Sequence, residues 1–181
     1  MTNSLDIIAL EAGETSRVAF STIAELASAI CEEHLDSWSH RVLQEAGIHL
    51  EVTGREHIRQ NENYIVMSNR QSRYDIPVLY QALGIPMQMM ETKEIAGLPF
   101  KARLSGKQIL PVTIDGTQQV QARGQLRASP ENTARVTISA PIDPAKCSSE
   151  RMDGLITVVK DVIERHLPAP PELLTSEISG A

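Results

Sequence analysis

The feature that most constrains the fold is the segment from residue 64 to residue 79, where an apolar run, a polar turn and a helix start follow one another directly. Tyr64-Ile65-Val66-Met67 is a short apolar run of the kind that fills a buried strand. Asp75-Ile76-Pro77 is typical of a helix start, because an acidic cap precedes a proline in the first turn. The segment therefore predicts a strand, a turn and a helix, with functional side chains in the turn.

The rest of the chain supplies further elements of both kinds. Predicted strands cover residues 48–53, 86–90, 109–114 and 134–139, and predicted helices cover residues 15–31, 35–46, 75–83 and 148–167. We therefore predict an α/β fold, a small mixed or parallel sheet flanked by helices. The expected organisation is N-terminal helices over 1–47, an α/β domain over 48–167 and a disordered tail over 168–181.

Composition excludes several function classes. The chain has 181 residues, a net charge of −6 and 3% aromatic residues, and no basic run alternates with aromatics, so nucleic acid is not an expected partner. Cys31 and Cys147 lie far apart and are expected to be reduced. Because no apolar stretch is long enough to span a membrane and no signal peptide is recognisable, we expect a cytoplasmic protein. The helix over 15–31 has an acidic polar face, which favours packing on the core over the membrane interface.

The turn resembles the first sequence block of the glycerolipid acyltransferases, the 1-acyl-sn-glycerol-3-phosphate acyltransferase family. In that family a strand ends in Ser-Asn-His-Gln-Ser, and an Asp lies five positions after the His. The His is the general base on the acceptor hydroxyl, and the Asp orients it. Arg70 occupies the position of the His, whereas the matching residues are Gln71, Ser72, Asp75, Ile76 and Pro77.

The resemblance implies acyl transfer from acyl-CoA or acyl carrier protein to the hydroxyl of a lysophospholipid, with no cofactor and no metal. It makes Asp75 the orienting carboxylate and Arg70 the residue at the base position. The residues implied in substrate binding are Asn69, Gln71, Ser72, Arg73 and Lys93.

Arg70 cannot replace the base, because a guanidinium stays protonated and offers no lone pair. Its simplest structural role is an ion pair with Asp75 across the turn. His57 is no substitute, since a whole strand separates it from the turn and would place it at the opposite end of the sheet.

Later parts of the chain match the family with an internal gap. The apolar run around Pro111 resembles the fourth block, and Ala140-Pro141-Ile142-Asp143 resembles a late turn of the family. The two middle blocks, which hold the acceptor phosphate, have no counterpart. A basic cluster falls in their place and has two interpretations, substitute phosphate ligands or a solvated helix face; its members are Lys93, Lys101, Arg103 and Lys107.

These observations predict an acyltransferase-like protein of phospholipid biosynthesis with impaired or no catalysis. The alternatives are a non-catalytic lipid- or partner-binding pseudoenzyme and a remnant without function. Transient contact with the inner membrane surface is compatible with both the acyltransferase-like protein and the lipid-binding pseudoenzyme. Because lost internal strands would leave sheet edges uncovered, we also expect a homodimer or a poorly soluble monomer.

Overall fold

The computed structural model describes residues 7–12, 23–59, 62–89, 102–103, 105–123, 132–146 and 152–168. They form a mixed sheet with helices on both faces, which confirms the predicted fold class. The strands are β1 (Ile7–Ala12), β2 (His49–Thr53), β3 (Tyr64–Asn69), β4 (Met87–Met89), β5 (Gln108–Asp115) and β6 (Thr133–Ile138). The α-helices are α1 (Ile23–Glu45), α2 (Asp75–Leu83), α5 (Thr117–Arg123) and α6 (Met152–Glu164), and the short 3-10 helices are η1 (Arg55–His57) and η2 (Pro144–Lys146).

The six strands lie in the order β2-β6-β5-β3-β1-β4. β3 and β5 are parallel neighbours at the centre, with Ser68 opposite Val112. β6 runs antiparallel to β5, and β2 runs parallel to β6. β1 is antiparallel to both β3 and β4, so β4 runs parallel to β3, with β1 inserted between them. The carboxyl ends of β3 and β5 therefore lie side by side at the same end of the sheet.

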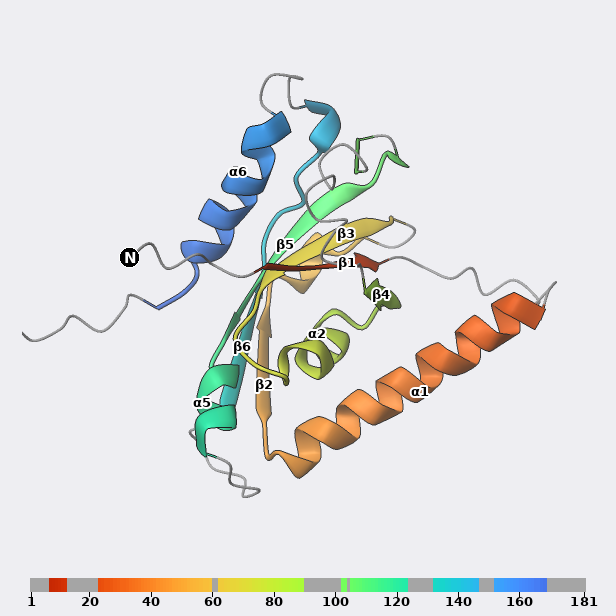
Figure 1. Cartoon of the computed structure of the whole chain (residues 1–181), viewed down its shortest axis with the longest axis vertical. Coiled ribbons are helices and arrows are strands. Elements are labelled where there is room, and N and C mark those ends of the chain that lie inside the picture. Colours follow the sequence, from red (N-terminus) through yellow and green to blue (C-terminus); the bar gives the residue numbers. More distant parts are fainter. Residues whose placement is uncertain are drawn as a thin grey trace, which may run out of the picture.

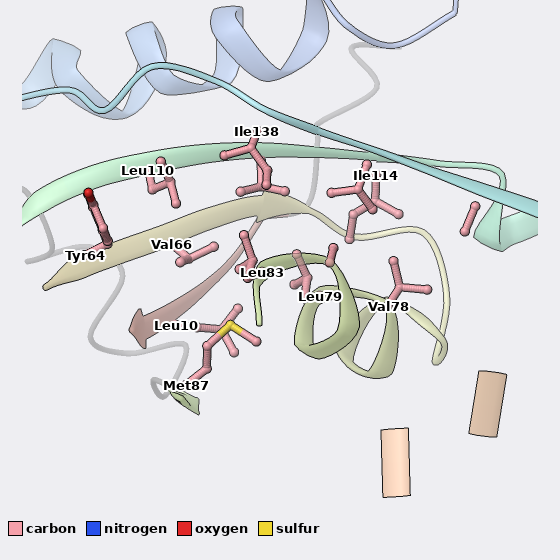
Figure 2. Packing of buried hydrophobic residues seen from close by; sticks show 14 of the residues in the cluster. Leu10, Tyr64, Val66, Val78, Leu79, Leu83, Met87, Leu110, Ile114 and Ile138 are labelled. Carbon is pink, nitrogen blue, oxygen red and sulfur yellow. The ribbon is translucent and has the colours of Figure 1, made fainter. Parts of the chain in front are cut away.

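The two faces of the sheet bury separate apolar clusters. Figure 1 shows α6 against one face and α1 and α2 against the other. On the α2 side, Val78, Leu79 and Leu83 face the side chains of the central strands, including Val66 and Leu110 (Figure 2). On the α6 side, buried helix residues pack with residues of β3 and β5, among them Leu155, Val159, Ile163, Ile65 and Ile109. Because both faces are covered, β3 is buried along its whole length, as its apolar sequence predicts.

α2 begins and ends close to the predicted positions. Its first helical residue is Asp75, preceded by Tyr74 as the N-cap, and Gly84 ends it in a left-handed conformation with φ 62°. The helix is held on α1 by Gln81, whose Nε2 donates to Ser39 Oγ over 2.8 Å and to Asp36 Oδ1 over 2.9 Å. α2 thus carries the turn before it in a fixed position between α1 and the sheet.

The N-terminal region differs from the prediction. Ile7–Ala12 is a strand of the sheet, where only helices were predicted, and one continuous helix, Ile23–Glu45, stands in place of two. The short Ile7-Ile8-Ala9-Leu10 run becomes a strand because it pairs with β3 and β4, which are distant in sequence. Cys147 and the predicted tail from residue 169 lie outside the described residues. Within the described part of the chain, no helix combines the length and the apolar character needed to cross a membrane.

Candidate functional site

The polar turn is built where β3 and β5 end side by side. Asn69, the last residue of β3, is buried and uses its side-chain amide to extend the pairing between the two strands. Its Nδ2 donates to Ile114 O, and its Oδ1 accepts from Ile114 N, each over 2.8 Å. This geometry gives Asn69 a structural role, and its contact with a substrate stays a prediction.

Asp75 organises the turn that follows, residues 70–75, which we call the Asp75 turn. Its side chain is buried, at 1% exposure. Oδ2 accepts from the backbone N–H groups of Gln71 and Ser72, over 2.7 and 2.8 Å. Oδ1 accepts from Thr117 Oγ1 over 2.6 Å. Three hydrogen bonds to one carboxylate compensate the cost of burying its charge.

Thr117 is the residue that sequence reasoning missed. It is buried at the start of α5, directly after the turn at Gly116. Gly116 has φ 93°, and a Cβ there would lie 2.2 Å from Thr133 O, so only glycine fits between β5 and β6. The usable signal was topological: parallel strands bring their carboxyl ends together, and Thr117 follows β5 as the Asp75 turn follows β3.

Ser72 supports the same turn. It is buried, and its Oγ accepts from Tyr74 N over 3.0 Å. Gln71 is half-buried, and its Oε1 lies 3.3 Å from Thr117 Oγ1. Both residues were predicted to bind substrate, which stays a prediction; what the geometry gives is their part in holding the turn.

Arg70 does not form the predicted ion pair with Asp75, so that interpretation was wrong. Within the described part of the chain its side chain has neither a hydrogen bond nor an ion pair, and it is exposed. The reason is competition: the backbone N–H groups of Gln71 and Ser72 already donate to Oδ2 of Asp75, and the Thr117 hydroxyl donates to Oδ1, so the carboxylate is engaged without ordering a long side chain. The guanidinium is left facing solvent at the carboxyl end of β3.

The other predicted site residues are distributed unevenly. Arg73 is exposed and its guanidinium lies 5.1 Å from the centre of the Tyr74 ring. Lys93 and Lys101 lie outside the described residues. Lys107 directly precedes β5, at the end of the sheet opposite the Asp75 turn, so it cannot supply phosphate-binding charge there.

No described histidine serves the Asp75 turn. His57 lies before β3, with its Nδ1 2.8 Å from Ile138 O, which confirms its predicted place at the opposite end of the sheet. The remaining histidines are exposed; they are His34, His40, His49 and His166. Among the described residues, no group of three His, Cys, Asp or Glu side chains is arranged to hold a metal ion. The turn therefore offers a rigid backbone, an engaged carboxylate and an exposed cation.

Comparison with known proteins gives a likeness in fold. No family model matches the chain, and no curated protein matches it. Among solved structures it is similar to the 1-acyl-sn-glycerophosphate (LPA) acyltransferase PlsC from Thermotoga maritima, with a TM-score of 0.56. The identity is 21% over 78% of this chain and 80% of that chain. At this identity the likeness shows that the two chains share a fold.

The bond between Thr117 and Asp75 predicts a measurable loss of stability. In Thr117→Val the shape is kept but Asp75 Oδ1 loses its side-chain partner, which we expect to lower the free energy of unfolding by about 1–3 kcal/mol. Urea denaturation measures this as a lower midpoint with an unchanged slope. Thr117→Ser keeps the hydroxyl and should lose about 1 kcal/mol or less, for one buried methyl group. Equal losses in the two variants would contradict the assigned role.

Proposed function

We propose that this chain is an acyltransferase-like protein of phospholipid metabolism that binds substrates of the acyl-thioester and lysophosphatidate class without efficient acyl transfer. The observation that carries the proposal is the Asp75 turn, in which a buried carboxylate holds the backbone while Arg70 stands where the resembled family has its His. The fold likeness to a lysophosphatidate acyltransferase supports the choice of substrate class.

The chemistry of Arg70 limits what the turn can do. Acyl transfer to a hydroxyl needs a group that removes the hydroxyl proton, and such a base is worth roughly 10²–10⁴-fold in rate. A guanidinium cannot accept that proton. Asp75 is an unsuitable substitute, because it is buried and accepts hydrogen bonds from Gln71, Ser72 and Thr117. The remaining turn can hold a ligand but has no group to activate it.

A non-catalytic lipid-binding role is the alternative that one further observation favours. Arg70 is exposed and its side chain has no partner within the described residues. A planar guanidinium recognises phosphate through two parallel hydrogen bonds. The exchange of a base for a guanidinium would therefore replace proton transfer by recognition of an anionic head group.

Membrane-surface contact and self-association complete the proposal. A phosphate-bearing lipid would be met at the inner membrane surface, which requires only peripheral contact. The sheet ends in β2 on one side and β4 on the other, and an unpaired edge strand is a template for pairing with a second copy. We expect a homodimer, and sedimentation velocity showing a stable monomer at micromolar concentration would count against it.

Catalysis is tested by thiol release from acyl-CoA in the presence of lysophosphatidate. We expect no release above the buffer rate from the unaltered chain, because no base is present at the turn. Arg70→His restores an imidazole at that position and is measured alongside, after circular dichroism has shown both proteins folded.

The possible results of this assay distinguish between the causes of an absent acyl transfer. Release by the unaltered chain would overturn the proposed loss of catalysis. Recovery in Arg70→His alone would place the whole defect at Arg70. Absence of release from both proteins would assign the loss also to the missing phosphate-binding blocks.

Lipid binding is tested by flotation with phosphatidylcholine vesicles that contain lysophosphatidate. We expect the chain to float with these vesicles and Arg70→Gln to bind them roughly tenfold or more weakly, since a hydrogen bond between charged groups is worth about 1.5–3 kcal/mol. Arg55→Gln is the matched control, because Arg55 is exposed, carries the same charge and lies after β2 near the opposite end of the sheet. Equal losses in the two variants, or no flotation of the unaltered chain, would contradict recognition by Arg70.

A further inference from the structure

A polar pocket lies at the amino end of β5, away from the Asp75 turn. Its volume is about 340 Å³, within the range of small-ligand sites. The polar residues that line it come from η1, the start of β5 and the segment after β6; they are Glu56, His57, Arg59, Gln108, Asp143 and Lys146. We call it the His57 pocket. None of its residues belongs to the Asp75 turn.

The position of His57 is fixed by two independent features. Its Nδ1 lies 2.8 Å from the carbonyl oxygen of Ile138, the last residue of β6. Gly54, with φ 83°, allows this close approach, since a Cβ at that position would lie 2.0 Å from the same oxygen. A backbone carbonyl and a glycine without a side chain thus set the ring at the pocket wall.

This hydrogen bond also fixes where the ring carries its proton. A carbonyl oxygen can only accept, so Nδ1 must be the donor. In the neutral ring the lone pair is then on Nε2, the nitrogen without a partner in the described part of the chain. The His57 pocket therefore contains a hydrogen-bond acceptor of fixed direction.

The charged side chains of the pocket differ in whether they have hydrogen-bond or ion-pair partners. Asp143 Oδ1 accepts from Ala145 N over 2.9 Å, and its Oδ2 lies 3.9 Å from Lys146 Nζ. Arg59 Nη1 lies 3.3 Å from Glu62 Oε1. Glu56, by contrast, has no hydrogen bond or ion pair within the described residues.

The carboxylate of Glu62, which pairs with Arg59, also accepts a hydrogen bond from Tyr64. The Tyr64 hydroxyl donates to Glu62 Oε2 over 2.9 Å and accepts from Arg59 N over 3.0 Å. Burial of the phenol, and to a lesser extent the nearby Glu62, raises the pKa of Tyr64 above its usual value, so the hydroxyl keeps its proton and remains a donor. The basic side chains of the pocket thus have acidic partners, whereas the Glu56 carboxylate, His57 Nε2 and the Gln108 side chain have no partner among the described residues.

We propose that the His57 pocket binds a small organic cation with a primary ammonium group, held by the Glu56 carboxylate and His57 Nε2. An ammonium offers N–H donors to both acceptors and balances the one unmatched negative charge. A metal ion suits the site less well, because no group of three ligating side chains occurs in the described part of the chain. This site is separate from the proposed lipid function, and neither depends on the other.

The test is a titration of the full chain, labelled with ¹⁵N, with ethanolamine as the probe. We expect saturable shifts of the His57 ring and of the η1 amides, with a millimolar dissociation constant, as befits so small a ligand. Before ligand is added, in mildly alkaline buffer, the ring nitrogens should show a protonated Nδ1 and an unprotonated Nε2. Choline carries the same charge without N–H donors, and should bind at least severalfold more weakly than ethanolamine.

The variant Glu56→Gln removes the carboxylate at an exposed position of η1 and should weaken ethanolamine binding about tenfold or more. Glu45→Gln, at the exposed end of α1, loses the same charge away from the pocket and should bind as the unaltered chain does. Saturation by inorganic phosphate but not by ethanolamine would overturn the proposal in favour of anion binding by Arg59 and Lys146. Equal affinity for choline, equal losses in the two variants, or no saturable shift with any probe would also overturn it.

Discussion

The buried carboxylate of Asp75 is the group on which the functional end of the molecule depends. It connects two segments that are far apart in sequence: the turn that leads from β3 into α2, and the first residue of α5. Hydrogen bonds to a charged group are worth about 1.5–3 kcal/mol each, and a buried N–H left without its acceptor costs about as much. This one side chain therefore ties the turn after β3 to the start of α5, in addition to the pairing of β3 with β5.

The partners of Asp75 explain why the turn does not depend on the side chain at position 70. Two of its three donors are backbone N–H groups, which any residue at position 70 leaves in place. The third is the hydroxyl of Thr117, the first residue of α5. Because the side chain of residue 70 contributes nothing to this network, its identity can change without loss of the architecture. The ordered structure of the turn consequently reflects folding stability and carries no information about proton transfer.

The sequence anticipated the local elements and missed the non-local ones. The strand, turn and helix over residues 64–83 were predicted because apolar runs, Pro77 and Gly84 act over short distances. The strand Ile7–Ala12 was missed because its stability comes from pairing with β3 and β4. Thr117 was missed for the same reason, since its partner Asp75 lies 42 residues away in sequence. The predicted ion pair between Arg70 and Asp75 was wrong because the prediction considered only the opposite charges of the two side chains. Backbone N–H donors lie nearer to the Asp75 carboxylate.

The parallel pairing of β3 and β5 gives the sheet two chemically different ends. At the carboxyl end, the Asp75 carboxylate accepts hydrogen bonds from the backbone, and the exposed guanidinium of Arg70 has no partner among the described residues. At the amino end, basic side chains are paired and a carboxylate and an imidazole nitrogen are left over. Each end thus presents the charge opposite to that of the ligand it would attract. The two ends are separated by the length of β3, which is buried throughout and paired with β5. A substitution at Arg70 and one at Glu56 are therefore expected to act independently of each other.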